Sequence, residues 1–437
     1  MTNAMTQQRK RATYTAYKPS GLMWLEDVPS MWPISRLRFQ VKINPVKSEI
    51  RGIPQDTSVS FVPMEAVGEY GGLRLEQTHA LEDVANGYTY FRDGDVVVAK
   101  ITPCFENGKG SIADGLENGI GFGTTELHVL RPSSFMDRNY LFYLTISHAF
   151  RKIGASYMYG AGGQKRVSDT FIRDFRHPIP TTNEQHSIAT FLDRETARID
   201  ALIEKKRCQI ELLQEKRSAL ISHAVTKGLN SSPPMKDSGF EWLGKIPAHW
   251  QVLPIKRVAR MESGHTPDKK VEEYWTDCKI PWVSLNDTAY LKEHDYIEDT
   301  AFHVNELGLA NSSAHLLPAR VVLFTRDATI GLSAITKRPM AVSQHIIAWI
   351  CGSRIIPEYL LRVFYSMTQE LERLCMGSTI RTLGMPDVLE LVTPLPPVEE
   401  QQRIVDHLVT EVPKLVALEG KVEESIRLLI EHRAALI

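Results

Sequence analysis

The chain of 437 residues repeats a short sequence half its length apart, and this internal repeat constrains the fold more than any other feature. The segment PIPTTNEQHSIATFL, residues 178–192, returns as PLPPVEEQQRIVDHL, residues 394–408. Both copies contain Pro-x-Pro, then Glu-Gln, then apolar residues at helical spacing. A repeat of this kind indicates duplicated structural units, so we expect two similar halves.

A second repeated signature lies upstream of the first. SGLMWLEDVPSMW, residues 20–32, returns as SGFEWLGKIPAHW, residues 238–250, and pairs Trp24 with Trp242 and Trp32 with Trp250. Tryptophans shared by both halves favour a packing role over substrate readout. Because the two signatures recur in the same order at nearly the same shift, we predict the arrangement body–helix–body–helix.

The sequence after each Pro-x-Pro predicts the start of a long helix. In the first copy Thr181, Thr182 or Asn183 can cap the helix, and Glu184 follows near its positive end. In the second copy Pro397 and the acidic residues after it favour a helix start of a different kind. We therefore expect a central helix over 181–225 and a C-terminal helix over 397–437.

Apolar residues recur at heptad spacing along both predicted helices, which is typical of a coiled coil. Lys206 interrupts the series in the first helix, and Pro413 predicts a bend in the second. The heptad positions are Leu192, Ile199, Leu213 and Leu220 in the first helix and Leu408, Leu415, Val422, Leu429 and Leu436 in the second. Each helix would bury one stripe, and the natural partner of one helix is the other.

The two bodies contain short β-rich runs separated by polar, glycine-rich stretches, which predicts mixed α/β domains with long loops and an α+β fold overall. The expected strands lie in 59–64, 95–101, 126–132, 279–285, 320–326 and 344–350. The expected divisions are an N-terminal arm at 1–19, a first body at 20–180, a linker at 226–237 and a second body at 238–396.

Motifs of common catalytic sites are missing from the sequence. We find no phosphate-binding Gly-x-x-x-x-Gly-Lys-Ser/Thr loop, no His-Glu-x-x-His and no Gly-x-Ser-x-Gly. The Asn-Pro-Pro-aromatic motif of amino-methyltransferases is also absent. The five cysteines are far apart in sequence, which supports neither a zinc site nor a disulfide framework. We expect reduced thiols, most of them buried, and neither a catalytic site nor a metal site in this chain.

A net charge of −1 leaves nucleic-acid binding to local clusters of lysine and arginine. The segment 151–176 holds six Lys or Arg and two Asp among tyrosines and glycines, and we expect Gln164, Lys165 and Arg166 to contact DNA. The alternative is a solvated turn before the helix. The corresponding residues in the second half are Ser378 and Arg381.

Polar residues that close apolar strands are further candidates for DNA contact. Lys100 and Thr102 close one strand, Thr325 and Arg326 close another, and Lys109 follows in a loop. The alternative is that they merely solvate the strand ends. The basic arm residues 9–11 are also candidates for phosphate contact, although such arms are often disordered.

Nothing in the sequence indicates a membrane span or a secretory signal. No run of 18 or more apolar residues occurs, and the N-terminal residues are polar without an apolar core segment. We expect a cytoplasmic protein.

The two signatures together resemble a known family. Two W-L-x-x-I/V-P-x-x-W motifs each open a body that ends in P-I/L-P-x-x-x-E-Q and a long helix. This order is similar to that of the DNA specificity subunit of Type I restriction–modification systems, and the resemblance extends from Ser20 to Ile437. It implies two target recognition domains, each reading one part of a split, asymmetric site in double-stranded DNA. It also implies that the helices pair as an antiparallel coiled coil, which sets the spacer in a pseudo-twofold subunit.

The resemblance further implies that this chain is not itself an enzyme. Two methylation subunits that use S-adenosylmethionine would bind it, and two restriction subunits that use ATP and magnesium can join them. One departure is that SHAVTKGLN, residues 222–230, continues the first helix copy, while the second copy reaches Ile437. This difference puts the partner contact at that end in doubt.

Two other interpretations stay open at this point. One is a non-catalytic coiled-coil scaffold whose two binding domains are not specific for DNA. The other is an enzyme with a degenerate motif. Sequence preference on DNA separates the first interpretation from a specificity subunit, and the recognised bases do not follow from the sequence.

Overall fold

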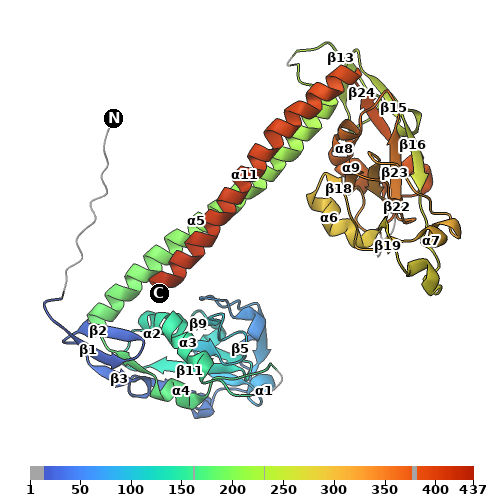
Figure 1. Ribbon diagram of the computed structural model, residues 1–437. Helices are drawn as coiled ribbons and strands as arrows, with labels where there is room; N and C mark the ends of the chain where they lie inside the picture. Colours follow the sequence, from blue (N-terminus) through green and yellow to red (C-terminus); the bar gives the residue numbers. More distant parts are fainter. Residues whose placement is uncertain (1–13, 161–162, 231, 376–380) are drawn as a thin grey trace, which may run out of the picture. The chain divides into compact units, whose positions relative to one another are not determined.

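The computed structural model of the protein describes residues 14–160, 163–230, 232–375 and 381–437 (Figure 1). The chain divides into two compact units, Met1–Lys205 with Ser425–Ile437 (unit 1) and Lys206–Glu424 (unit 2). Each unit contains one body and a section of each long helix, because the division passes through both helices. The predicted helices over 181–225 and 397–437 correspond to α5 (Thr182–Lys227) and α11 (Val398–Leu436).

Among the described residues, the body of unit 1 is built on two four-stranded sheets and two strand pairs. The strand pairs are β1 (Tyr17–Leu22) with β2 (Leu25–Pro29), and β12 (Arg176–Pro178) with β3 (Ile34–Arg36). One sheet has the order β6 (Gln77–Ala80), β5 (Ser58–Val62), β10 (Ile120–Gly123), β7 (Thr89–Arg92), and the other β4 (Val41–Ile43), β11 (Leu127–Pro132), β8 (Val96–Ala99), β9 (Gly110–Ile112). The helices of this body are α1 (Leu81–Val84), α2 (Arg138–Ile146), α3 (His148–Ser156) and α4 (Asp169–Asp174).

In the part of unit 2 that the structure describes, the body has a five-stranded sheet, a three-stranded sheet and two strand pairs. The strand pairs are β13 (Met235–Asp237) with β14 (Lys245–Pro247), and β15 (Gln251–Pro254) with β24 (Val392–Leu395). The five-stranded order is β16 (Ala259–Ser263), β23 (Ile346–Cys351), β20 (Val322–Thr325), β21 (Ser333–Thr336), β18 (Tyr296–Ile297), and the three-stranded order is β19 (His303–Val304), β17 (Ile280–Val283), β22 (Ala341–Val342). The helices are α6 (Thr288–Glu293), α7 (Glu306–Ala310), α8 (Pro357–Ser366), α9 (Thr368–Leu374) and α10 (Met385–Glu390).

All six predicted strands are present, as β5, β8, β11, β17, β20 and β23, and the predicted α+β content is confirmed. Strand β8 shows why a continuous run of apolar residues predicted a strand correctly. Val96 and Val98 pack into the cluster that includes α2 and α3, while Val97 and Ala99 pack into a second cluster on the opposite face. Because successive side chains of a strand point to opposite faces, a strand buried on both faces is apolar throughout.

The repeated Pro-x-Pro and Glu-Gln motif attaches each long helix to its body. The buried amide of Gln185 accepts a hydrogen bond from the Asp137 N–H at 2.8 Å and donates to the Pro180 carbonyl at 2.9 Å and the Phe135 carbonyl at 3.1 Å. Thr181 caps α5, since its Oγ1 accepts from the Glu184 N–H at 3.4 Å, and its own N–H donates to Glu184 Oε2 at 2.9 Å. The motif therefore connects the helix start to the loop before α2.

Gln401 makes the corresponding contacts in unit 2. It accepts from the Ile356 N–H at 3.0 Å and donates to the carbonyls of Arg354 and Pro396 at 2.8 and 2.9 Å. The residue is fully buried, like Gln185. The chain repeats the motif because each body needs the same attachment for its helix.

The tryptophan signature packs as predicted. Trp250 is fully buried, and Trp242 lies against the same core cluster. In unit 1 Trp24 stacks on Phe175 with ring centroids 5.9 Å apart, and Trp32 Nε1 donates to Glu184 Oε1 at 3.3 Å. The signature thus holds the first strands of each body near the start of its helix.

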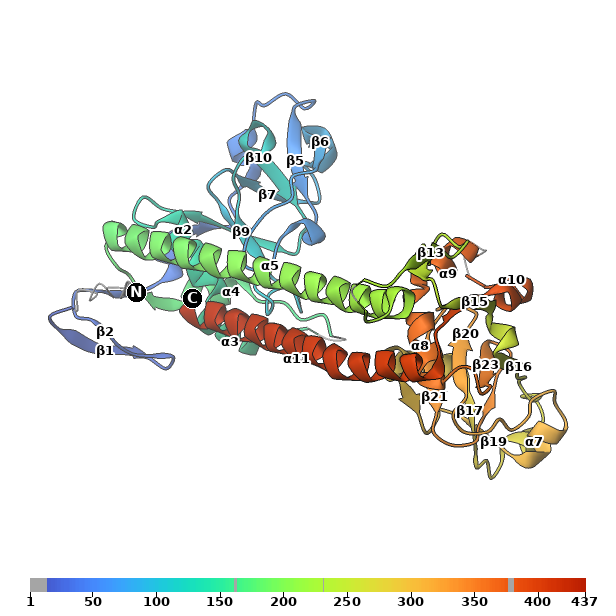
Figure 2. The same cartoon turned by 90° about the horizontal axis from the view of Figure 1, so that it is seen from above.

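Both long helices bury the predicted stripe. Leu192, Ile199 and Leu213 in α5, and Leu408 and Val422 in α11, are buried, and the other heptad positions are half-buried. Polar pairs join the helices within each unit: Arg433 Nε donates to Asp200 Oδ1 at 2.8 Å in unit 1, and Gln214 Nε2 donates to Glu419 Oε1 at 2.5 Å in unit 2. Figure 2 shows α5 and α11 in green and red. Pro413 lies inside α11 without interrupting it.

The cysteines remain free thiols, as expected, but the prediction that most are buried is wrong. Cys208 is exposed on α5, and the other four are half-buried. In the part of the chain that the structure describes, no helix is both long and apolar enough to cross a bilayer.

The buried residue His177, which precedes Pro178, makes the stability of unit 1 depend on pH. His177 Nδ1 donates to the Pro178 carbonyl at 2.9 Å, and burial lowers the pKa of His177 to about 4 from an ordinary value of about 6.5. At the corresponding position Thr393 Oγ1 donates to the Pro394 carbonyl at 2.9 Å. The substitution His177→Thr therefore offers a side chain that keeps this hydrogen bond and does not titrate.

We expect wild-type stability to fall relative to His177→Thr as the pH drops from 6.5 to 4. In this window the unfolded chain takes up a proton that the buried imidazole does not, so the lost stability reaches about 3 kcal/mol at the acid end. Above about pH 7.5 the imidazole is neutral in both states and contributes no pH dependence. Urea unfolding of both proteins at pH 7, 5.5 and 4.5 measures the difference. A difference in free energy of unfolding that stays constant with pH contradicts the prediction.

Candidate nucleic-acid interface

The predicted contact residues of unit 1 meet where strand β8 ends. The Lys100 N–H donates to the Glu126 carbonyl at 2.9 Å, and the Lys100 carbonyl accepts from the Val167 N–H at 2.8 Å. The Thr102 N–H donates to the Lys165 carbonyl at 2.9 Å. Three loops that are distant in sequence, around residues 101, 125 and 165, therefore form one surface region.

The same backbone pattern recurs in unit 2 at the end of strand β20. The Arg326 N–H donates to the His345 carbonyl at 3.0 Å, and its carbonyl accepts from the Leu383 N–H at 2.9 Å. The Ala328 N–H donates to the Arg381 carbonyl at 3.0 Å. Each unit therefore places one basic residue at the strand end and one on the facing loop, Lys100 and Lys165 in unit 1 and Arg326 and Arg381 in unit 2.

In the structure, Lys100 of unit 1 corresponds to a residue of unit 2 that lies one position later than the sequence comparison suggested. Matching DVVVAKIT (95–102) with RVVLFTRD (320–327) pairs Lys100 with Thr325. In the structure, β8 ends at Ala99 and β20 at Thr325, so Lys100 corresponds to Arg326. The hydrogen bonds of the loops decide the alignment here, because the apolar strands alone match in more than one register.

Arg166 is occupied by an acidic partner that the sequence analysis did not identify. Its Nε lies 2.9 Å from Glu126 Oε2 and its Nη2 lies 2.9 Å from Glu126 Oε1, a two-point contact with the carboxylate. The guanidinium of Arg166 lowers the pKa of Glu126, and nearby Lys100 acts in the same direction. The sequence contained an indication of this ion pair, since the acidic residue Glu126 directly precedes strand β11.

Two other predicted side chains also form hydrogen bonds within the body of unit 1. Thr102 Oγ1 donates to Glu106 Oε1 at 3.1 Å, and Lys109 Nζ donates to the Met64 carbonyl at 3.2 Å. The structure therefore brings the predicted DNA-contact residues of unit 1 together. Of these residues, only Gln164 and Lys165 are exposed.

Thr325 does not occupy the exposed position that the sequence suggested. It has no exposed surface, its hydroxyl donates to the Thr329 carbonyl, and the same oxygen accepts from the Leu332 N–H at 3.0 Å. Thr325 thus closes the loop after β20 and presents no group to a ligand. The reason is that strand β20 lies inside its sheet and both of its faces are covered.

Next to Thr325 the structure places an acid–imidazole pair that the sequence analysis missed. Arg326 Nε lies 3.5 Å from Asp327 Oδ2, and His345 Nδ1 lies 2.7 Å from the same oxygen. Arg381 is exposed on the facing loop. The predicted contacts Ser378 and Arg9, Lys10 and Arg11 lie outside the described residues.

Exposed aromatic side chains flank the basic loop of unit 1. Tyr157 and Tyr159 are 65% and 64% exposed, and the backbones of Tyr159 and Arg166 exchange hydrogen bonds of 3.2 and 2.9 Å. Exposed tyrosines beside a lysine suit a phosphate backbone and base edges. Among the described residues, no group of three or more His, Cys, Asp or Glu side chains could hold a metal ion.

The chain is similar to curated proteins of one kind. It is 34% identical over 229 residues to the Type I restriction enzyme EcoAI specificity subunit of Escherichia coli. This match covers 52% of this chain and 37% of that protein. It is 35% identical over 198 residues to the Type I restriction enzyme EcoEI specificity subunit of Escherichia coli, and this match covers 45% of this chain and 33% of that protein. The matched part thus spans about a third of the length of these relatives.

A solved structure described as showing complex assembly and conformational transition of the type I R-M system has the same fold. It aligns with a TM-score of 0.71 over 93% of this chain and 97% of that one, at 18% identity. A model of the family described as the Type I restriction modification DNA specificity domain matches residues 73–212 and 247–427. Since these segments make up well over half of the sequence, the chain belongs to the family of Type I restriction modification DNA specificity domains.

Proposed function

We propose that this chain is the non-catalytic DNA specificity subunit of a Type I restriction–modification complex. The observation that carries the proposal is the duplicated surface at the ends of β8 and β20, where Lys165 and Arg381 occupy corresponding places in bodies of different sequence. Two different readers on the same kind of attachment suit a bipartite, asymmetric site in double-stranded DNA. Each body is then a target recognition domain, over residues 20–180 and 238–396.

The helices α5 and α11 are proposed to form an antiparallel coiled coil that sets the unread spacer. Asp200 contacts Arg433, and Gln214 contacts Glu419. The two contacts are 14 residues apart on each helix but follow opposite sequence directions, which supports an antiparallel pairing. At 1.5 Å per residue the 46 residues of α5 extend about 69 Å. The matching attachments at Gln185 and Gln401 support a pseudo-twofold subunit.

A pseudo-twofold subunit can offer similar surfaces to two identical partner chains. We therefore infer two methylation subunits that carry S-adenosylmethionine as partners, with two restriction subunits that use ATP and magnesium able to join. The catalytic chemistry is assigned to these partners. The complex would act in the cytoplasm, where cellular DNA is accessible.

The competing function is a coiled-coil scaffold whose bodies bind something other than DNA. The two functions are separated by selection from a pool of random duplexes, using the chain assembled with its cognate methylation subunit. The proposal expects retained duplexes to share two short motifs at a fixed separation. Retention without any shared motif favours the scaffold.

The basic residues on the facing loops give a more local prediction. We expect Lys165→Ala and Arg381→Ala each to weaken binding to the selected duplex about three- to tenfold, since each removes one exposed positive charge. Each should also reduce the slope of log affinity against log salt by about one. Lys216→Ala, on the exposed surface of α5, is the matched control. An equal loss in the control, or unchanged affinity in both loop variants, contradicts the assignment.

A further inference from the structure

The exposed side chain of Gln344 ends a chain of hydrogen bonds on the candidate interface of unit 2. Gln344 lies just before strand β23, which pairs with strand β20 (Figure 2). The next residue, His345, accepts a hydrogen bond from the Arg326 N–H through its carbonyl at 3.0 Å. Gln344 therefore lies beside the strand end that carries the predicted contact residue Arg326.

The side chains around Gln344 determine which way its amide points. Asp327 is 8% exposed, and its carboxylate, which only accepts hydrogen bonds, lies 2.7 Å from His345 Nδ1. A neutral His345 therefore carries its hydrogen on Nδ1 and leaves Nε2 as an acceptor. Gln344 Nε2 then donates to His345 Nε2 at 3.2 Å, and Gln344 Oε1 accepts from the Thr266 hydroxyl at 2.7 Å. This network fixes the oxygen end and the nitrogen end of the amide.

The loop that carries Thr266 is itself held against a neighbouring strand. A Cβ atom on Gly264 would lie 1.6 Å from the carbonyl oxygen of Val342 in strand β22, so the close approach requires glycine. Trp282 Nε1 also donates to the His265 carbonyl at 3.2 Å. These two contacts position the Thr266 hydroxyl next to Gln344.

Each polar atom of the Gln344 amide keeps one hydrogen-bonding site after these contacts. The amide oxygen has two lone pairs and the NH₂ group has two hydrogens, and the protein uses one of each. An acceptor beside a donor matches the N6 amino group and N7 of adenine in the major groove. The exposed amide therefore suits adenine better than the other three bases.

The corresponding position in unit 1 carries a different side chain. The hydrogen bonds at the two strand ends align Glu126 with His345, so Thr125 corresponds to Gln344. Both Thr125 and Gln344 are exposed, and each lies two positions before the start of a strand. A threonine and a glutamine at the same place in two related loops suit the reading of different bases.

We propose that Gln344 is a specificity-determining residue of unit 2, which recognises an adenine in the second half of the DNA site by two hydrogen bonds. Thr266 and His345 are positioning residues that hold its amide. The inference rests on the proposed function, because it names a base that the second recognition domain reads. An amide that only closed the loop would act differently, since its loss would weaken binding to all duplexes equally.

The test measures base preference at each position of the second half of the motif, using the full chain assembled with its cognate methylation subunit. We expect Gln344→Ala to lower the discrimination for adenine at one position about tenfold or more, as for the loss of a bidentate contact. Gln344→Glu should move the preference at that position towards cytosine, whose N4 amino group donates to a carboxylate. Thr266→Val should lower the discrimination at the same position, but less than Gln344→Ala.

Gln402→Ala, on the exposed surface of α11, is the matched control and should leave every base preference unchanged. Circular dichroism melting shows that each variant folds. If the wild-type chain selects no shared motif, the proposed function fails and this inference fails with it. If the wild-type chain selects a bipartite motif and Gln344→Ala keeps the same bases with the same discrimination, the inference alone is overturned. Equal weakening of all duplexes by Gln344→Ala also overturns it and assigns the residue a structural role.

Discussion

Replacing Gln401 by alanine is expected to lower the free energy of unfolding of unit 2 by about 3 kcal/mol. The buried amide satisfies three backbone groups, and its loss leaves the Ile356 N–H and the carbonyls of Arg354 and Pro396 without that partner. Each buried polar group left unpaired costs about 1–3 kcal/mol, and relaxation recovers part of the total. Urea unfolding followed by circular dichroism measures the change.

The neighbouring residue gives a matched control. Gln402 is exposed, and its amide donates to Asp406 one turn along the same helix at 2.8 Å. Gln402→Ala should change stability by less than about 0.5 kcal/mol. Gln185→Ala should reproduce the large effect in unit 1. Similar effects for Gln401→Ala and Gln402→Ala would show that the repeated motif does not hold the helix to its body.

Exchanging residues 20–177 for the first recognition domain of another family member is expected to change one half of the recognised DNA motif completely. The reason is that the predicted contact residues of unit 1 come from loops of its own body, around Lys100, Glu126 and Lys165. Residues 238–393 stay unchanged, so the second half of the motif and the predicted contact residues Arg326 and Arg381 are preserved. Selected duplexes from both proteins report the two halves separately.

The reciprocal exchange of residues 238–393 is the control. It should change the other half alone and leave the separation of the halves the same. A change in both halves after either exchange contradicts the assignment of one reader to each body.

Much of the architecture was predictable because its signals are local or repeated. Strands such as β8 and β20 are apolar throughout because two cores cover them, and this makes them stand out between polar loops. The Pro-x-Pro motif and the heptad leucines mark the helices in the same way. The repeat then relates the two halves without any knowledge of their packing.

The side-chain environment of the interface could not be predicted in the same way. Arg166 pairs with Glu126, which is 40 residues away in sequence, and Thr325 is buried because the fold covers both faces of β20. Such contacts depend on which loops the fold brings together. The one-residue difference in aligning Lys100 with Arg326 has the same origin, since hydrogen bonds between loops and not the strand sequence define the match.

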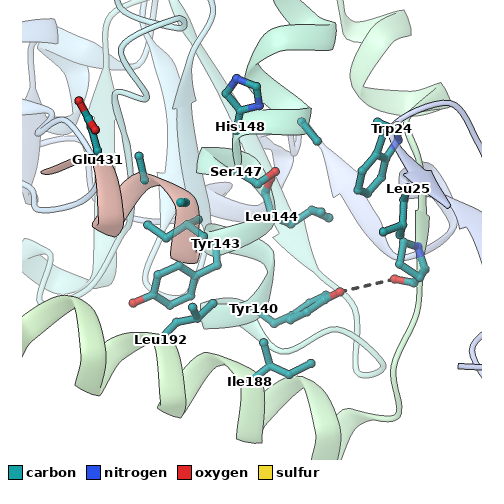
Figure 3. Close-up of a pocket in the computed structure, with 15 residues that line it drawn as sticks. Trp24, Leu25, Tyr140, Tyr143, Leu144, Ser147, His148, Ile188, Leu192 and Glu431 are labelled. Carbon is teal, nitrogen blue, oxygen red and sulfur yellow. Dashed lines mark hydrogen bonds between the residues drawn. The ribbon is translucent and has the colours of Figure 1, made fainter. Parts of the chain in front are cut away.

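The repeat also shows where the two halves stop being equivalent. In unit 2 the last turns of α5 complete the core around Tyr359, whereas around Tyr140 in unit 1 the corresponding space is a pocket lined by apolar residues such as Leu144 and Ile188 (Figure 3). Arg217 and Arg433 correspond at the shift of 216 residues, but their acidic partners do not, since Arg217 lies near Glu419 in unit 2 and Arg433 near Asp200 in unit 1. The surfaces of the two units are therefore similar but not identical.

The central claim is that one chain carries two readers of DNA held at a fixed separation. Its most direct test is to map methylated adenines across the genome of a cell that expresses this chain with its cognate methylation subunit. The account predicts methylation at a single bipartite, asymmetric motif whose halves are separated by a constant number of unread bases. A continuous motif, or unmodified DNA despite a properly assembled complex, would contradict it.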